Sequence, residues 1–552
     1  MASKRSWGWR ARQAIFLVRR ALGQRFLILA FVVFLCLFVV SISRTLLTLS
    51  SELTRSMSST ALMETPHKEA APQEVVEAPK ASCLRIWEPG SENAEQQVFV
   101  DRYLESRCDT IHISRALRVV QALEPLPVIT KEQVEAGWMN LCWGWSNEEE
   151  FAGYKFDVNN CHMGLRIQIL DNLLYFTPAP LNHTNFKDLE YLYAGYGTIL
   201  DDGLWFQVGR IVHGDPAYYD TSWTRHALHA LTSLQEMLAD HDVPDADFLL
   251  SFSDRCAPVA YQTLAQNLAP MMSWSLRDDN YGASCNALFL PTYDYTWSQQ
   301  DFKEGSPWRV DSYPPVPWEL KDARAVWRGT LTAVEPRARV LRMGLARPDL
   351  IDSRHTGPVD DCKRLYIPAL EKHGGPIGED DCERMTTESA LSAEGLLHYK
   401  YLLDVEGHGP SFRLKNLLLA NSVVFKLWEE GLQWFYPDLK AYKHYIPISA
   451  FNFELDLEKK IEWARHNDDV VKRIGERGAA FAKQYIDNPN LARYQALTIS
   501  LYASRLSYKP TKHPLAKLMC CRNLTMNSWN GELEHCRKRC RERPSVTSLC
   551  NQ

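Results

Sequence analysis

The 552-residue sequence has no excess of positive charge. Lys and Arg total 62 against 67 Asp and Glu, which gives a formal net charge of −5. Proteins that neutralise nucleic-acid phosphates usually carry a basic surplus, so the overall charge does not favour nucleic-acid binding. The cysteines also lack zinc-site spacing, because Cys520, Cys521, Cys536 and Cys540, even with His535, match no standard zinc pattern. We interpret these cysteines as disulfide partners.

Long apolar runs are scarce, and the one exception lies near the start. Residues 26–42 carry no charge over 17 residues, about 26 Å as a helix, which is enough for a thin bilayer. Residues 1–25 contain seven basic residues and no acidic one, which predicts that they stay in the cytoplasm and the rest is lumenal. A cleaved signal peptide is the alternative, but no clean A-x-A site follows the run. We expect a transmembrane signal anchor at 26–47 and a stem at 48–82.

Of the fourteen cysteines, thirteen follow the predicted membrane segment. An oxidising lumen makes disulfides the default state, and the odd number leaves at least one thiol free or intermolecular. The spacing does not decide which cysteines pair. Two sequons, at Asn182 and Asn523, permit N-glycosylation in the same compartment.

The length and an apolar fraction of 45% allow two or three domains with a sizeable core. The apolar pattern predicts a strand pair at 165–177, a helix at 224–240 and a strand at 248–252. Helix followed by strand indicates an α/β layer. A polar and then proline-rich segment at 301–320 is typical of an inter-domain connection.

The most informative stretch is residues 399–447. An apolar strand at 401–405 is broken by Glu406-Gly-His-Gly-Pro410, and the pattern then predicts a helix at 412–421 capped by Ser411. Free backbone N–H groups at a helix N-terminus suit a phosphate.

Arg413, in the first turn of this helix, would add a cation with fork geometry for a diphosphate. The alternative is an ordinary strand–helix turn with a surface arginine.

The order of the motifs in this stretch resembles the C-terminal core of glycosyltransferase family 90, which contains Rumi-like protein O-glucosyltransferases and fungal capsule-associated xylosyltransferases. The resemblance rests on YKYLLDVEGHGPSFRLKN, NSVVFK and FYPDLKAYKHYIP in the family's order. It extends more weakly over residues 247–493 and leaves the cysteine-rich tail at 503–552 outside. It implies an α/β fold of the GT-B type, with two facing Rossmann-like domains at 83–300 and 321–502.

The resemblance also implies roles for single residues. Asp254 follows the predicted strand at 248–252 and aligns with the family's catalytic aspartate, although the neighbouring Cys256 departs from the family pattern. By position alone, Asp254 would be a loop residue that caps the next helix. Arg328 resembles the family's arginine that contacts the diphosphate; by itself it would be a surface cation at a strand end. The predicted nucleotide-sugar-binding residues are Arg328, His408, Gly409, Pro410, Ser411, Phe412 and Arg413.

Asp245-Ala246-Asp247 has the Asp-x-Asp pattern of a possible metal site. Metal-dependent sugar transferases usually carry this pattern just after an apolar strand, whereas here it precedes the strand at 248–252. We interpret it as a polar helix–strand turn. We therefore expect no metal and no other cofactor, with the helix dipole and the arginines balancing the charge of the leaving group.

These observations predict a membrane-anchored inverting glycosyltransferase that moves xylose or glucose from UDP-xylose or UDP-glucose to a hydroxyl of a glycan or protein. The anchor and stem favour the Golgi membrane and a glycan acceptor, with the ER as the alternative, and the sequence ends in Leu-Cys-Asn-Gln rather than an ER-retention signal. A catalytically silent lumenal carbohydrate- or glycoprotein-binding relative is the second hypothesis. Three closing helices are expected at 455–467, 468–485 and 491–502, the last crossing back to the first domain by resemblance.

Overall fold

The computed structural model of the chain divides it into residues 1–80 and 81–552. The structure describes residues 83–519 except 89, 106, 125–127, 140–163, 179–220, 252–267, 278–286, 293–308, 332–334, 364–366, 373–375, 388–389, 408 and 428–430. The predicted membrane anchor, the stem and both sequons, at Asn182 and Asn523, lie outside the described residues. Within the described ranges, no helix is both long and apolar enough to cross a membrane.

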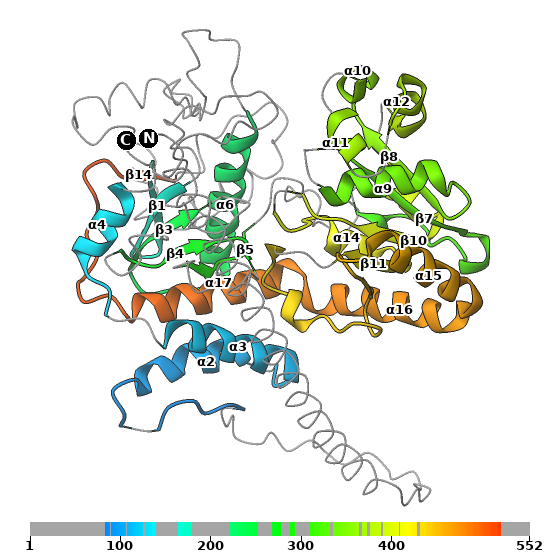
Figure 1. Cartoon of the computed structure of the whole chain (residues 1–552). Helices are drawn as coiled ribbons and strands as arrows, with labels where there is room; N and C mark the ends of the chain where they lie inside the picture. Colours follow the sequence, from blue (N-terminus) through cyan, green and yellow to red (C-terminus); the bar gives the residue numbers. More distant parts are fainter. Residues whose placement is uncertain are drawn as a thin grey trace, which may run out of the picture. The chain divides into compact units, whose positions relative to one another are not determined.

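The first of two six-stranded sheets is mixed, with the order β14-β2-β1-β3-β4-β6 (Figure 1). Its strands are β1 (Gly164–Leu170), β2 (Leu173–Pro178), β3 (Ala246–Ser251), β4 (Met271–Ser273), β6 (Ala287–Phe289) and β14 (Lys517–Leu518). β1 and β2 form the predicted strand pair, joined by Asp171 and Asn172, which both have positive φ as a tight hairpin turn requires. Among the described strands of this sheet, parallel pairing is limited to β3–β4 and β4–β6, so the Rossmann-like arrangement is limited to that half of the sheet.

Four of the described helices come before β3 in the chain. They are α2 (Gln97–Leu104), α3 (Thr110–Leu123), α4 (Lys131–Met139) and α6 (Thr221–Asp240). The side chain of Asp109 caps α3 by accepting from the N–H groups of Ile111 and His112. α6 confirms the helix that the apolar spacing predicts at 224–240.

The second sheet is parallel throughout, with the order β13-β11-β10-β7-β8-β9. Its strands are β7 (Asp322–Gly329), β8 (Ile351–Thr356), β9 (Thr386–Thr387), β10 (Tyr399–Asp404), β11 (Val423–Leu427) and β13 (Ile446–Ile448). Counted along the chain, this order is the doubly wound 3-2-1-4-5-6 order of a Rossmann sheet. The point where the winding direction reverses lies between β7 and β10.

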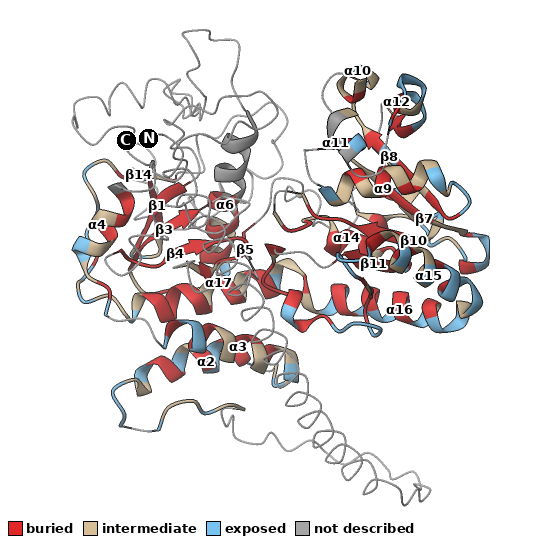
Figure 2. Ribbon diagram, in the orientation of Figure 1, coloured by how far each residue is buried: buried red, intermediate tan, exposed pale blue. Residues whose placement is uncertain are grey.

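Both faces of the second sheet are buried (Figure 2). Val326, Leu402 and Val424 belong to one apolar cluster, together with residues of α14 (Leu414–Leu419). Residues on the opposite face join α9 (Glu335–Ala346) and α15 (Phe453–His466) in a second cluster. The central strands β10 and β11 are apolar over most of their length, as expected for a parallel sheet that is covered on both faces, whereas β8 is mostly polar.

The segment between β8 and β10, which the sequence left uninterpreted, holds short helices. They are α10 (Val359–Asp361), α11 (Ile367–Lys372), α12 (Glu379–Met385) and α13 (Ala393–Leu396). Within this segment, a disulfide joins Cys362, just after α10, to Cys382 in α12. A second disulfide joins Cys83 to Cys108. These pairs confirm that disulfides form, and they settle four of the cysteines.

The three closing helices are confirmed as α15, α16 (Asp468–Tyr485) and α17 (Asn488–Ala503). α17 packs against α2, α3, α6 and β3, so the last helix returns to the first sheet as the resemblance implied. A two-stranded ladder of β5 (Leu276–Arg277) and β12 (Gly431–Leu432) also joins the two halves of the chain.

One prediction in this region was wrong in part. Asp245-Ala246-Asp247 was interpreted as a polar turn; Asp245 lies in the turn between α6 and β3, but Asp247 lies inside β3 and is 1% exposed. Its carboxylate accepts hydrogen bonds from Arg166, Gln168 and Tyr508. A buried ion pair with Arg166 on β1 makes a charged residue compatible with the strand, which the local pattern alone could not reveal.

Candidate active site

The reversal point of the second sheet is the place where doubly wound folds bind their ligands, just beyond the carboxyl ends of the two central strands. β7 ends at Gly329 and β10 ends at Asp404. The chain after β7 runs to α9 on one face of the sheet, and the chain after β10 runs through residues 405–413 to α14 on the other face. We call residues 405–413 the β10–α14 loop.

Arg413, at the end of this loop, reaches the end of β7. Its Nη1 donates to the carbonyl oxygen of Arg328, and its guanidinium lies 5.6 Å from the ring centroid of Trp327. The predicted loop cation is therefore placed at the reversal point, on the strand end that the sequence analysis also singled out.

Arg337, in the first turn of α9, brings a second guanidinium to the same strand ends. Its Nε donates to the carbonyl of Glu406 at 2.9 Å, and its Nη1 donates to the carbonyl of Thr330 at 2.8 Å. The guanidinium lies 6.0 Å from the Trp327 ring. The sequence analysis did not select Arg337 as a site residue. Its position in the first turn after the strand that ends in Trp327-Arg-Gly329 was the available signal.

Two glycines allow this close approach. A Cβ on Gly407 would lie 2.6 Å from Nη2 of Arg337, and a Cβ on Gly329 would lie 2.8 Å from the Trp327 ring. Both distances are shorter than ordinary contacts, so side chains at these positions would displace the arginine or the tryptophan.

Arg328 directs its own side chain elsewhere. Its Nη2 lies 2.9 Å and 3.0 Å from the two carboxylate oxygens of Asp352, and this carboxylate also accepts from the hydroxyl of Tyr399 at 2.8 Å. Burial by itself would raise the pKa of Asp352, but the hydrogen bonds from Arg328 and Tyr399 outweigh it and lower that pKa. Direct contact between Arg328 and a diphosphate stays a prediction, and it would compete with this ion pair.

Ser411 does not cap a helix, which corrects the sequence prediction. α14 begins at Leu414, and its N-cap is Arg413 without a side-chain hydrogen bond. The helix is short, so its dipole contributes little and the side chains have to supply most of the positive charge. The Ser411 side chain is 6% exposed, and its hydroxyl has no hydrogen-bond partner among the described residues.

Residues following β4 and β6 of the first sheet meet this loop. The rings of Trp274, which follows β4, and Phe412 lie 4.9 Å apart. A pocket between the two sheets is lined by both rings, by Thr292 after β6, and by Lys415 and Gln433 of the second half. The carboxyl ends of the parallel strands of both sheets therefore converge at Trp274 and Phe412.

Asp254 and His408 lie outside the described residues, so their predicted roles stay predictions. Asp254 follows β3, which is parallel to β4 and adjacent to it. Within the described part of the chain, no group of three or more His, Cys, Asp or Glu side chains could hold a metal ion. Metal independence also stays a prediction.

The sequence profile described as Glycosyl transferase family 90 matches residues 216–552. The chain belongs to this family. The match runs to residue 552, so our expectation that the tail at 503–552 lies outside the family was wrong. β14 agrees with this correction, because residues of the tail pair with β2 of the first sheet.

Curated relatives carry related names. The chain is 29% identical over 204 residues to protein O-glucosyltransferase 1 of Homo sapiens. This match covers 37% of this chain and 47% of the human protein. It is 27% identical over 273 residues to protein O-glucosyltransferase 3 of Rattus norvegicus, a match that covers 49% of this chain and 48% of the rat protein. It is 25% identical over 285 residues to the O-glucosyltransferase rumi homolog of Aedes aegypti, a match that covers 48% of this chain and 63% of the mosquito protein. The matched part thus spans about half the length of the first two relatives.

A solved glycosyltransferase structure from Rickettsia africae ESF-5 aligns with 46% of this chain and 68% of that one, at 10% identity and a TM-score of 0.29. This score is too low to carry an argument.

Proposed function

We propose that the chain is a UDP-sugar-dependent, inverting O-glycosyltransferase of GT-B architecture that acts in the lumen of the secretory pathway. Membership of family 90 supports the transferase activity, and the names of the curated relatives favour glucose over xylose as the transferred sugar. The basic N-terminus and the apolar run at 26–42 support a membrane anchor and a Golgi location. The acceptor would be a hydroxyl of a glycan or of a protein.

One observation carries the proposal. Arg413 and Arg337 come from elements on opposite faces of the second sheet and meet around Trp327 at the reversal point. Two planar cations at the carboxyl edge of a doubly wound sheet provide a site for a nucleoside diphosphate. We propose that the hydroxyl of Ser411 adds a further donor to this site.

The reaction follows from this placement. The sugar attached to the diphosphate would lie between the β10–α14 loop and the edge of the first sheet, near Phe412 and Trp274. Asp254, which follows β3 in the sequence, would remove the proton of the acceptor hydroxyl, whose oxygen bonds to C1 of the sugar. The bond from C1 to the phosphate oxygen breaks, and UDP leaves with its added charge balanced by Arg413 and Arg337.

The test measures UDP affinity of the full chain in detergent, and UDP release from UDP-glucose and UDP-xylose with excess EDTA. Arg413→Met and Arg337→Met should each weaken UDP binding about tenfold or more, since each removes a charge-assisted contact. The matched control is Arg339→Met, because Arg339 lies on the same helix as Arg337 but binds Glu454 at 2.7 Å. Unchanged UDP affinity in both test variants would contradict the proposed site.

Asp254→Asn separates catalysis from binding. It should abolish transfer and leave UDP affinity within about twofold of the unaltered chain, because only the proton acceptor is lost. Tight UDP binding by the unaltered chain, with no transfer from any UDP-sugar to any acceptor tried, would favour the silent carbohydrate-binding relative.

A further inference from the structure

A buried lysine lies beneath the β10–α14 loop. Nζ of Lys426, on β11, lies 3.1 Å from a carboxylate oxygen of Asp404 and 3.8 Å from one of Glu406. The side chains of Lys426, Asp404 and Glu406 are 1%, 0% and 4% exposed. Asp404 is the last residue of β10, and Glu406 is the second residue of the loop.

The lysine stays charged in this environment. Burial lowers the pKa of Lys426, but the carboxylates of Asp404 and Glu406 raise it by more, so the net pKa lies above its ordinary value. Burial also raises the pKa of Tyr436. The phenol therefore keeps its proton and can donate it in a hydrogen bond.

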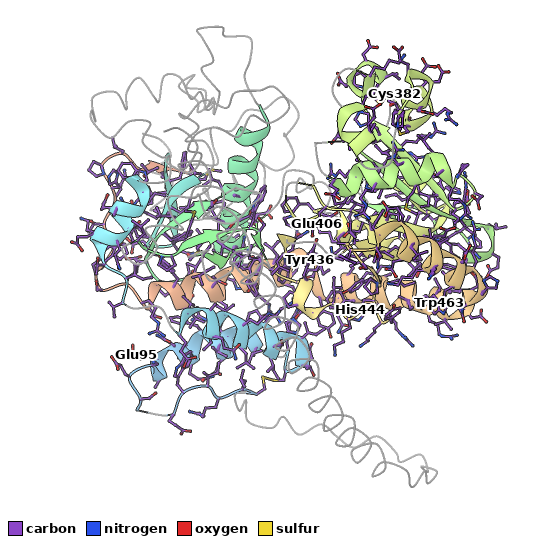
Figure 3. The ribbon with its side chains drawn as sticks, in the orientation of Figure 1. Glu95, Cys382, Glu406, Tyr436, His444 and Trp463 are labelled. Atoms are coloured by element: carbon purple, nitrogen blue, oxygen red, sulfur yellow. A yellow bond between two sulfur atoms is a disulfide. The ribbon has the colours of Figure 1, made fainter. Side chains whose placement is uncertain are left out.

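The cluster is connected to both ends of the loop. At the start, a carboxylate oxygen of Glu406 accepts from the N–H of Gly431 at 3.1 Å. Towards the end, Nζ of Lys426 lies 4.4 Å from the ring centroid of Tyr436, whose hydroxyl donates to the carbonyl of Ser411 at 3.3 Å. Figure 3 labels Glu406 and Tyr436, the members of the cluster that make these two connections.

Two further contacts tighten this support. Nε2 of Gln433 donates to the carbonyl of Ser411 at 2.9 Å. A Cβ added to Gly431 would lie 2.6 Å from the backbone nitrogen of Pro410, so the backbone of β12 presses directly against the loop. The loop is thus supported from β10, β11 and the segment that follows β12.

The network is not arranged for stability alone. Oδ1 of Asp404 is buried without a hydrogen-bond partner in the described part of the chain. A buried carboxylate oxygen without a donor is costly, and a buried ion pair can often be replaced by apolar side chains without loss of stability. The geometry that the cluster imposes on the loop explains why charges at these positions are useful.

We propose that Lys426 is a positioning residue, whose ammonium group fixes the β10–α14 loop so that Ser411 and Arg413 face the diphosphate. This inference rests on the proposed function for the identity of the ligand, but the rigidity of the loop can be tested without a ligand.

The test compares the full unaltered chain with Lys426→Met and with the double variant Lys426→Met/Asp404→Leu. The single change leaves a buried carboxylate unpaired and should lower the Tm by several degrees or more. The double change removes Lys426 together with its closer partner and should restore part of the Tm, because only the Glu406 carboxylate is then left without its cation. In both variants, backbone amides of residues 405–413, apart from Pro410, should exchange with solvent at least about tenfold faster than in the unaltered chain.

Lys321→Met is the matched control. Lys321 is also a buried lysine, but it binds the carbonyls of Ala420 and Asn421 and the hydroxyl of Ser422, at the far end of α14. This change should lower the Tm and leave amide exchange in the loop unchanged, apart from any global unfolding.

UDP affinity is the second readout. The double variant should bind UDP about tenfold more weakly despite its partly restored Tm, whereas Lys321→Met should bind within about twofold of the unaltered chain. If loop exchange and UDP affinity both recover with the Tm in the double variant, Lys426 is only structural and the inference is overturned. Failure of the unaltered chain to bind UDP would refute the proposed function alone, because loop exchange would still decide the role of Lys426.

Discussion

Arg115 and Asp438 lie 323 positions apart in the chain and form a buried ion pair. Nε of Arg115 is 2.7 Å from a carboxylate oxygen of Asp438, and their side chains are 0% and 2% exposed. The same guanidinium lies 4.3 Å from the ring centroid of Trp434, which lines the pocket beside Phe412. Arg115 is on α3, before the residues 216–552 that match the family. The helix pair α2–α3 is therefore integrated with the half that carries the candidate site.

Breaking this pair predicts a large loss of stability. Arg115→Met leaves the Asp438 carboxylate buried with less compensation, and it should lower the free energy of unfolding by about 3–5 kcal/mol in urea titrations. The control is Arg118→Met, because Arg118 binds the other oxygen of the same carboxylate at 2.7 Å but is 27% exposed. We expect a loss of only about 1 kcal/mol there. Equal losses for the two variants would show that burial of the pair does not decide its contribution.

A second prediction concerns the contact between Gly431 and the β10–α14 loop. An added Cβ would meet backbone atoms of Pro410 at 2.6 Å and 2.9 Å, and backbone cannot move aside as a flexible side chain can. Gly431→Ala should push the β10–α14 loop outward, weaken UDP binding about tenfold and cost about 1–3 kcal/mol of stability. In Gly378→Ala the nearest atom to the new Cβ is a side-chain oxygen at 3.7 Å, so UDP affinity should be unchanged. Isothermal titration with UDP measures both variants, and tight binding by Gly431→Ala would exclude the close contact.

Local patterns predicted the elements of the second half well. The helix predicted at 468–485 is α16 to the residue, and the apolar run at 401–405 corresponds to β10. These elements bury a continuous apolar face against a parallel sheet, so their spacing in the sequence is direct evidence for them. The family motifs then indicated the loop that ends in Arg413, which the structure places at the reversal point.

Features that depend on long-range contacts were not predictable in this way. Arg337 is one of several arginines on an amphipathic helix, and only the fold shows that it faces Gly407 rather than solvent. Asp247 was interpreted as part of a turn because its partner Arg166 is 81 positions away. Ser411 was interpreted as a helix cap, whereas its carbonyl is held by Gln433 and Tyr436 from beyond the next strand.

The disulfide between Cys362 and Cys382 gives a third prediction. It closes a loop with a sequence separation of 20, which contains α11 and the start of α12, and its removal should cost about 2–4 kcal/mol by relaxing the unfolded state. Cys362→Ala with Cys382→Ala should lower the Tm but keep UDP affinity within about twofold, because the disulfide lies next to β8 and β9 at the edge of the sheet, whereas the β10–α14 loop follows the central strand β10. The double variant is compared with the unaltered chain by thermal unfolding and UDP titration. A tenfold loss of affinity would instead mean that this segment helps to form the site.

A fourth prediction concerns His444 and the dependence of the free energy of unfolding on pH. The side chain is 5% exposed, its Nδ1 accepts from the N–H of Lys440, and its ring stacks on Phe481 at 4.8 Å. Burial, together with the charges of Lys443, Lys440 and Arg477, lowers its pKa to about 4.

The sign of the effect follows from comparing the folded and unfolded chains. In the unfolded chain, His444 is protonated below its ordinary pKa of about 6.5. In the folded chain, it is protonated only below about pH 4. The contribution of the neutral ring is therefore complete above pH 6.5 and is lost as the pH falls towards 4, by at most about 3 kcal/mol. Urea titrations at pH 7.5 and 4.5 measure this loss. His444→Asn keeps an acceptor for Lys440 but does not titrate, so it should lose less stability between these two pH values than the unaltered chain. Equal losses would assign the acid sensitivity to other groups.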